Sequence, residues 1–116
     1  MTRVLNTQTK AFLAMLDKLA PFEYGPCPLT DGAPREWRKK DFGSLTYYDG
    51  EWNTDGLRHG LGRQLDYKDT YYEGYWFKNK KHGRGRQVTF EGLTYEGDFK
   101  KGLYDGFGIL KSKSGY

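Results

Sequence analysis

The stretch YYEGYWFKNKKHGRGRQ, residues 71–87, decides the fold because it joins two halves of different chemistry. Its first half alternates with a period of two, so that Tyr72, Gly74 and Trp76 face one way and their neighbours the other, as in a β-strand. Its second half, HGRGRQ, carries glycines at alternate positions. The sequence NKK between the halves, residues 79–81, predicts a hairpin turn. The whole stretch therefore predicts one β-hairpin.

The same pattern occurs three times within residues 42–116. The segments YDGEW, YEGYW and YEGDF open the repeats at residues 48, 72 and 95, and HGLGRQL, HGRGRQV and DGFGIL follow them. The opening tyrosines lie 24 and then 23 residues apart. A partial unit, DFGSLTY at residues 41–47, precedes the first repeat. Successive hairpins predict a mainly β fold, a single-layer twisted antiparallel sheet of about six to eight strands.

The glycines of the repeats need a reason, because glycine weakens a strand unless a neighbouring group uses the space. We expect aromatic rings to lie across bare glycine backbone on adjacent strands, which stabilises a sheet that has no second layer. This fits a composition in which 17% of the residues are aromatic and only 36% are hydrophobic. The predicted packing residues are the rings Tyr48, Trp52, Tyr72, Trp76, Tyr95 and Phe99 and the glycines Gly50, Gly60, Gly62, Gly74, Gly83, Gly85, Gly97, Gly106 and Gly108.

Residues 1–20 predict a short N-terminal amphipathic helix. Apolar residues recur at spacings of three or four and form one stripe, which consists of Leu5, Phe12, Met15, Leu16 and Leu19. Asn6, Thr7 or Thr9 can cap its start, and Pro21 ends it. We interpret it as a helix that packs on its own domain or on a partner. Its basic, amphipathic character also fits a mitochondrial targeting helix.

Residues 21–41 contain all four prolines and predict an extended connector. Because such a segment does not ordinarily order itself, we expect something outside this chain to hold it. Cys27, between two prolines, is interpreted as a free thiol, since no base is placed near it in the sequence.

The pattern Y-x-G-x-W/F, a short turn and H/D-G-x-G, at a spacing of 23 residues, resembles the MORN (membrane occupation and recognition nexus) repeat. The match covers residues 42–116 with three clear units and one partial unit, although the third has Phe99 for Trp and Asp105 for His. The resemblance implies a sheet of stacked hairpins that serves as an interaction or assembly module. Members occur in axonemal and cytoskeletal structures, in membrane-junction proteins and beside catalytic domains. No catalytic domain accompanies the repeats here.

Catalytic, metal and phosphate-loop sites are not favoured by the motifs. GRGR, residues 83–86, lacks the third glycine, the lysine and the helix start of a phosphate loop, and Phe107 replaces the basic residue in the third repeat. His59 and His82 occupy equivalent positions in two repeats, so repetition explains them better than metal or acid–base chemistry. We therefore expect no enzyme activity, no cofactor, no metal and no nucleic-acid partner.

The basic residues leave an alternative open. The net charge is +4, with 19 basic and 15 acidic residues interspersed along the chain. Turns on the same edge of the sheet stack about 10 Å apart, so their cations can form a patch that meets anionic lipid headgroups or an acidic protein surface. The candidate residues are Lys78, Lys80, Lys81, Arg84, Arg86, Lys100 and Lys101.

The function that the sequence favours is a non-catalytic structural or scaffold subunit of a large multiprotein assembly, either mitochondrial or axonemal. We expect it to bind other subunits through the aromatic sheet face and the N-terminal helix. The predicted partner-binding residues are Phe12, Leu16, Leu19, Trp37, Tyr71, Tyr75, Phe77 and Phe90. The alternative is an adaptor that binds anionic phospholipids through its basic turns.

Overall fold

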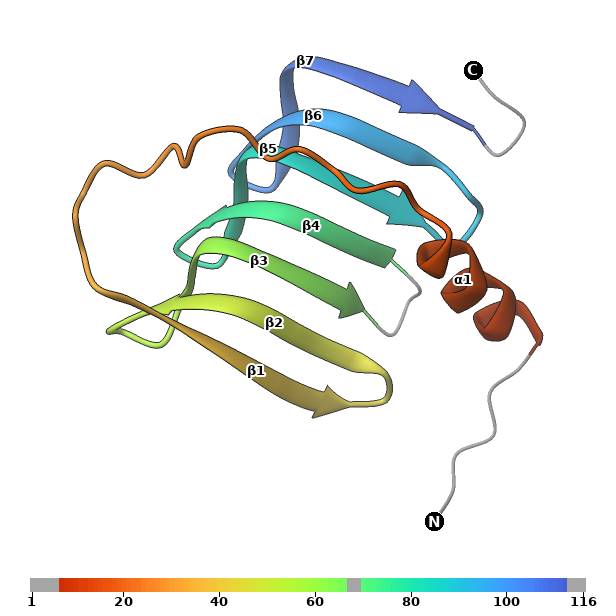
Figure 1. The fold of residues 1–116 in the computed structure, drawn as a ribbon, viewed down its shortest axis with the longest axis horizontal. Helices are drawn as coiled ribbons and strands as arrows, with labels where there is room; N and C mark the ends of the chain where they lie inside the picture. Colours follow the sequence, from red (N-terminus) through yellow and green to blue (C-terminus); the bar gives the residue numbers. More distant parts are fainter. Residues whose placement is uncertain (1–6, 67–69, 113–116) are drawn as a thin grey trace.

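One helix precedes seven strands, which form a single antiparallel sheet in chain order (Figure 1). The computed structural model describes residues 7–66 and 70–112. The elements are α1 Thr7–Asp17, β1 Arg35–Gly43, β2 Thr46–Asn53, β3 Arg58–Asp66, β4 Thr70–Phe77, β5 Lys80–Thr89, β6 Thr94–Lys100 and β7 Leu103–Lys111. The predicted mainly β, single-layer meander of hairpins is confirmed.

The N-terminal elements differ from the prediction in their bounds. Helix α1 is described from Thr7 and ends at Asp17, although the amides of Lys18 and Leu19 still bond to carbonyls of its last turn. The predicted helix residues 1–6 lie outside the described part of the chain. Residues 35–41, which were predicted to belong to the connector, form most of β1, because their backbone pairs along the length of β2.

Two-residue turns join three of the hairpins. Lys78 and Asn79 both have positive φ, 44° and 71°, as a turn matched to the twist of a hairpin requires. Ser44–Leu45 and Lys101–Gly102 have the same conformation in the first and last hairpins. The turn predicted at residues 79–81 is thus displaced, because β5 already begins at Lys80.

Each repeat contains a β-bulge at the same position. The register of the paired strands shifts at residues 51, 75 and 98. Opposite each of these single residues the partner strand has three residues, 59–61, 82–84 and 105–107 respectively. The glycine at the centre of each bulge has positive φ: 108° at Gly60, 74° at Gly83 and 64° at Gly106. The prediction that these three glycines lie under aromatic rings is therefore wrong; they supply a backbone conformation that other residues rarely adopt.

Three of the six remaining glycines do lie under rings. A Cβ atom added to Gly62, Gly85 or Gly108 would overlap the ring of the tyrosine on the neighbouring strand, Tyr48, Tyr72 or Tyr95 in that order. Each tyrosine hydroxyl also donates a hydrogen bond, of 2.7–2.9 Å, to the carbonyl three residues further along. Gly50, Gly74 and Gly97 lie directly opposite those three glycines, so the paired backbones approach closely.

The rings form a continuous row across the sheet, which we call the aromatic ladder. Neighbouring rings meet edge to face, with centroids 4.9–5.4 Å apart, in the order Trp52, Tyr48, Trp76, Tyr72, Phe99 and Tyr95. All six are at most 7% exposed, although no second layer covers them in the described structure. We call this side of the sheet the ladder face.

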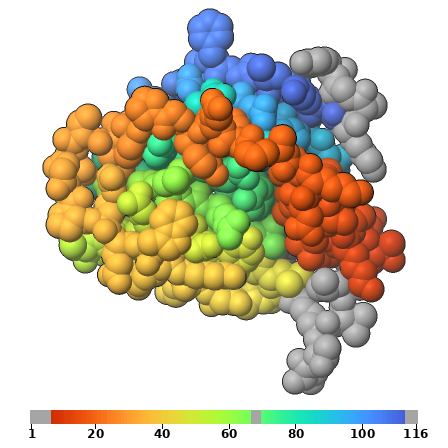
Figure 2. Space-filling view, in the orientation of Figure 1, coloured from red at the N-terminus to blue at the C-terminus, as the bar shows by residue number. Residues whose placement is uncertain are grey.

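The N-terminal segment covers the opposite side, the helix face. Phe12 of α1 packs with Leu65, Tyr71 and Val88 in a second buried cluster. After the helix, residues 20–34, called the strap, cross this face before the chain enters β1 (Figure 1), and Figure 2 shows the helix and the strap in front of the sheet.

Side chains of the sheet hold the strap by its backbone. Arg86, Arg84 and Tyr75 donate hydrogen bonds of 2.8, 3.0 and 2.6 Å to the carbonyls of Ala20, Glu23 and Gly25 respectively. The expectation that something outside the chain orders this segment is therefore wrong, because the sheet of the same chain does so.

Candidate functional site

Two cations lie above the aromatic ladder at the edge that carries the turns at residues 54–57 and 78–79. The Arg58 guanidinium lies 4.8 Å from the centre of the Trp76 ring, and the Lys81 ammonium lies 5.2 Å from that of Tyr72. Both positions open the second half of a repeat, so the repeat itself explains why a cation recurs there. Such cation–π contacts hold both side chains against the sheet.

The hydrogen-bond partners of these two cations are neutral. Arg58 donates to Gln64 and, over 3.1 Å, to the Asn79 side chain; Lys81 donates to Gln87 over 2.6 Å. Burial lowers the pKa of the Arg58 guanidinium and of the Lys81 ammonium below their ordinary values. Neither forms an ion pair with a described carboxylate. Two partly buried positive charges therefore lie here without a close ion pair to a described residue, although the Asp66 carboxylate is near enough to act on the charge of Lys81.

The same cations line a groove on the ladder face, which we call the cation groove. Two cavities of about 370 and 280 Å³ adjoin there and share Arg58, Gln64 and Asn79. The first is completed by Lys40, Phe42, Thr46, Trp52 and Gly56, and the second by Trp76, Lys80, Lys81, Lys101 and Gly102. Among the residues that the structure describes, no carboxylate lines either cavity. The arrangement attracts an anionic group and offers it several N–H donors.

The structure divides the seven predicted anion-contacting cations between different surfaces. Lys80, Lys81 and Lys101 line the cation groove. Lys100 lines a neighbouring cavity of about 140 Å³ beside Phe77 and His82, which Lys80 and Lys101 also line, and Lys78 lies over the Phe77 ring. Arg84 and Arg86 point to the helix face, where the strap occupies them. The single predicted patch is thus wrong, because successive strand residues face opposite sides of the sheet.

Arg86 stabilises the contact between the sheet and the strap. It is 5% exposed and bonds to Glu73 over 3.1 Å and to Glu96 over 3.3 Å, in addition to the Ala20 carbonyl. Its guanidinium also lies 5.3 Å from the ring centre of Phe22 in the strap. The residue therefore acts as a structural tie and is not available to a lipid headgroup.

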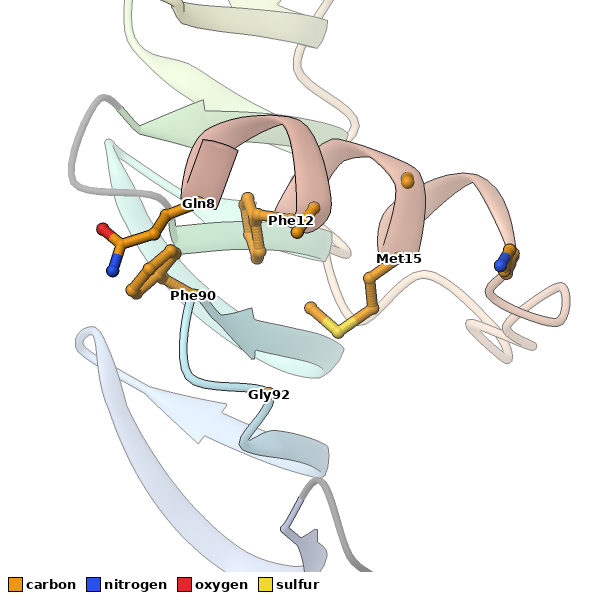
Figure 3. Close-up of a pocket in the computed structure, with 8 residues that line it drawn as sticks. Gln8, Phe12, Met15, Phe90 and Gly92 are labelled. Carbon is orange, nitrogen blue, oxygen red and sulfur yellow. The ribbon is translucent and has the colours of Figure 1, made fainter. Parts of the chain in front are cut away.

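A second groove runs beside α1. It has a volume of about 570 Å³ and is lined by Gln8, Ala11, Phe12, Ala14, Met15, Lys18, Phe90 and Gly92. Figure 3 shows the Phe12 and Phe90 rings beside each other, with Met15 extending on the side of Gly92. The two ring centres are 6.5 Å apart. We call this site the helix groove; its lining is mainly apolar, so it suits an apolar side chain of another protein.

Most of the predicted partner-binding residues contact this chain instead. Phe12, Tyr71 and Tyr75 are buried, and Leu16, Leu19 and Phe90 are partly buried against the cluster under the helix. The reason is that α1 and the strap fold back over the outward-facing side chains of β3, β4 and β5. Trp37 and Phe77 do remain exposed, at 54% and 39%.

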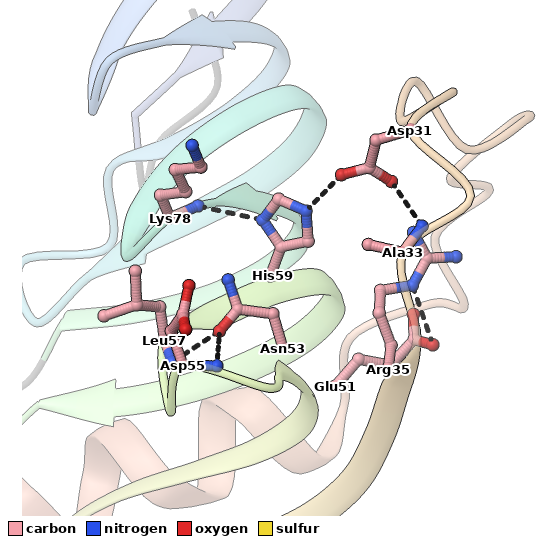
Figure 4. A network of polar contacts seen from close by, with 9 residues as sticks. All are labelled: Asp31, Ala33, Arg35, Glu51, Asn53, Asp55, Leu57, His59 and Lys78. Atoms are coloured by element: carbon pink, nitrogen blue, oxygen red, sulfur yellow. Dashed lines mark hydrogen bonds and ion pairs between the residues drawn. The ribbon is translucent and has the colours of Figure 1, made fainter.

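His59 connects the strap to a hairpin (Figure 4). Its side chain is 1% exposed; Nδ1 accepts the backbone N–H of Lys78 over 3.1 Å, and Nε2 lies 3.0 Å from Asp31 Oδ2. Because Nδ1 is an acceptor, we assign the proton to Nε2, which donates to the carboxylate. This hydrogen bond holds the pKa of Asp31 below its usual value. The pair positions the strap.

Sequence reasoning overlooked Arg58 and Asp31. A signal for Arg58 was present, because it stands six residues before Gln64 as Lys81 stands six before Gln87. The sequence contains no comparable signal for Asp31, because this residue lies outside the repeats. Among residues 7–66 and 70–112, no group of three metal-ligating side chains comes together. In the same ranges, no helix has the length and apolar character needed to cross a bilayer.

Comparison with known proteins identifies the repeats. The family described as MORN repeat matches residues 48–68, 72–92 and 95–115. These three matches coincide with the three hairpin units that carry the aromatic ladder. A search of curated proteins found no match.

Proposed function

The chain belongs to the MORN repeat family, and from that premise we propose that it is a non-catalytic structural accessory subunit of a large multiprotein assembly. MORN repeats are generally protein- or lipid-binding modules and are not catalytic. The assembly that we propose is mitochondrial or axonemal, and the partners are its other protein subunits.

The observation that carries this proposal is the helix groove. Helix α1 covers the sheet through Phe12, yet about 570 Å³ of largely apolar space remains beside Phe12, Met15 and Phe90 at the margin of this contact. Ala11 and Ala14 keep that space open, because their side chains are small. Apolar space of this kind beside an amphipathic helix fits an apolar anchor from another subunit.

An Ala14→Arg variant tests this function, because residue 14 lies on the exposed side of α1 and the longer, charged side chain would enter the groove from there. Ala33→Arg is the matched control, since it makes the same change in an exposed part of the strap. The tagged chains are purified from their own cells, and the co-purifying subunits are quantified by mass spectrometry and by native size. We expect a stoichiometric complex with the wild type and the control, and its loss with Ala14→Arg. Recovery of the wild type alone, or equal complexes from all three chains, would contradict the proposal.

The cation groove favours a second candidate function, the binding of anionic phospholipids. Arg58 and Lys81 are held over aromatic rings with neutral partners, and Lys80 and Lys101 line the same groove. A lipid phosphate would supply the missing negative charge at this edge of the sheet.

Vesicle flotation separates this candidate from the first. Vesicles of phosphatidylcholine are compared with vesicles that also contain phosphatidylserine or a phosphoinositide. We expect the wild type to float with the anionic vesicles but not with the phosphatidylcholine vesicles. The Lys80→Glu/Lys101→Glu variant should float with neither. The control Lys10→Glu/Lys39→Glu has the same net charge but alters cations outside the groove, so it should retain flotation. Equal flotation of the two variants would contradict the proposed lipid binding.

A further inference from the structure

The outer edge of β7 combines exposed backbone with apolar side chains. One edge of β7 pairs with β6, and no described strand lies along the other. Of the eight large apolar side chains that are exposed in the described residues, five belong to this strand: Leu103, Tyr104, Phe107, Ile109 and Leu110. Phe107 is 91% exposed. An edge of this kind is a template for pairing with another strand.

The opposite end of the sheet is protected. Strand β1, of sequence REWRKKDFG, exposes Trp37 and Phe42, but its exposed side chains are mainly charged and include those of Arg38, Lys39 and Lys40. Charged side chains on an edge strand prevent it from pairing with another chain. The protein therefore blocks one edge of its sheet and leaves the other unprotected.

Tyr104 adds a further ring at the end of the aromatic ladder. Within the sheet, Tyr48 contacts Trp76 of the next repeat, and Tyr72 contacts Phe99 in the same way. Tyr95 contacts Tyr104 instead, with ring centres 3.8 Å apart and the planes nearly parallel. Tyr104 thus takes the position that Lys81 occupies over Tyr72, and it adds a half-exposed ring to the end of the aromatic ladder beside the β7 edge.

The sequence of β7 is complementary to itself about Gly108. A two-fold axis at Gly108 in an antiparallel pair puts Phe107 opposite Ile109 of the second copy, so that apolar side chains meet on the helix face. The same register puts Leu110 over Gly106, which has no side chain, and brings Asp105 to Lys111. Each contact is made twice by symmetry. Backbone pairing can extend to the bulge glycine, because the equivalent Gly60 and Gly83 pair on the outer edges of β3 and β5. They are the last residues to pair there, so the Asp105–Lys111 contact is one between side chains just beyond the paired backbone.

We propose that the outer edge of β7 binds the β7 edge of a second copy of this chain, which joins the two sheets into one continuous antiparallel sheet. The apolar side chains and the charge pair Asp105–Lys111 select the second copy in this register. The site is separate from both grooves and does not depend on the function proposed above.

Sedimentation equilibrium of the full chain tests the dimer, at concentrations up to roughly 100 µM, where an interface of micromolar affinity is populated. We expect a dimer for the wild type. Asp105→Lys and Lys111→Asp should each raise its Kd about tenfold, because like charges then face each other twice. The double variant Asp105→Lys/Lys111→Asp should restore the wild-type Kd. A monomeric wild type, or a double variant as weak as the single ones, would overturn the proposal.

Disulfide trapping tests the register and does not depend on the charge variants. In a Cys27→Ser background, a mixture of Phe107→Cys and Ile109→Cys chains should cross-link efficiently between the two variants, since those positions face each other. Ile109→Cys alone should cross-link poorly, because the two copies of residue 109 are offset. Circular dichroism confirms that each variant keeps its sheet. Equal cross-linking in the mixture and in the single variant would contradict the stated register.

Discussion

At the scale of single residues, the contact between a tyrosine ring and a glycine is what allows one layer of sheet to form a core. Tyr72 is 1% exposed because its ring lies against the bare backbone of Gly85, while its hydroxyl bonds to the carbonyl of Tyr75. The neighbouring rings then cover what the glycine leaves open. Any side chain at residue 85 would push the ring away from this position.

A Gly85→Ala substitution should therefore lower the free energy of unfolding by about 1–3 kcal/mol, the usual cost of overpacking. Gly102→Asn is the matched control, since residue 102 has open space around it and asparagine tolerates its positive φ. We expect the control to change stability by less than about 0.5 kcal/mol. Urea denaturation of both variants measures this, and equal losses of stability would contradict the ring-over-glycine account.

The buried tyrosines also make stability depend on alkaline pH. Burial raises the pKa of Tyr24 from 10.0 to about 12, with the Glu73 carboxylate adding to the effect, and burial likewise raises the pKa values of Tyr48, Tyr71 and Tyr72. A raised pKa in the folded state means that the unfolded chain loses these protons first. Stability should thus be fully present below pH 10 and fall as the pH rises through the folded values.

The dependence is tested by measuring the urea midpoint of unfolding from pH 8 to pH 12. We expect the midpoint to fall above pH 10, which is about the ordinary pKa of tyrosine. Replacing Tyr24 by Phe should reduce the alkaline loss, because one of the contributing phenols is then absent. Constant midpoints across the range would show that these phenols do not titrate differently in the folded and unfolded chains.

The sequence predicted that both glycines in the second half of each repeat lie under an aromatic ring. This prediction was right for one of the two and wrong for the other. Alternation with a period of two places both Gly83 and Gly85 on one face, yet only Gly85 lies under a ring. Gly83 has positive φ and faces Pro28 of the strap. The sequence shows that two glycines recur, but the bulge that separates their roles arises only when the neighbouring strand is paired.

At the scale of elements, the N-terminal segment and the sheet are joined through Arg86. Its guanidinium bonds to Glu73 and Glu96 on the two flanking strands and to the carbonyl of Ala20 where the strap begins. Removing it would leave Glu73, which is 8% exposed, without its cation. The penalty for an unpaired buried charge is larger than the net contribution of the pair itself.

Arg86→Met should accordingly lower the free energy of unfolding by about 3 kcal/mol or more. Arg63→Met makes the same change on the same face, but Arg63 pairs with Asp49 while its side chain is 54% exposed, so we expect at most about 1 kcal/mol there. Chemical denaturation of the two variants provides the comparison. A loss at Arg63 as large as that at Arg86 would refute the role given to Arg86.

Two features of the fold, β1 and the docking of the strap, could not be predicted from the sequence. The repeats predicted the hairpins from residue 48 onward because their period is visible in the letters. Residues 35–41 have no such period, and they become β1 because β2 offers them an edge to pair with. The strap is held by hydrogen bonds to its backbone carbonyls, which any sequence carries, so its docking site could not be read from its own residues.

At the scale of the whole molecule, the N-terminal segment determines which surfaces remain for partners. The helix and the strap cover part of the helix face, where they contact β3, β4 and β5, and Figures 1 and 2 show both in front of the sheet. Three surfaces are left: the cation groove on the ladder face, the helix groove beside α1, and the outer edge of β7. The aromatic residues that the sequence assigned to partner binding mostly hold the chain's own N-terminus.

The central claim is that this covering is part of the fold of the isolated chain, and nuclear Overhauser contacts test it most directly. The spectra are recorded on the purified protein without partners. We expect cross-peaks between the Pro28 ring and the α-protons of Gly83, and between the Phe12 ring and the methyl groups of Val88, because these groups are packed together. Sheet cross-peaks between β4 and β5 serve as the internal control. If the sheet cross-peaks are present and both N-terminal contacts are absent, the N-terminal segment does not cover the sheet and the claim is contradicted.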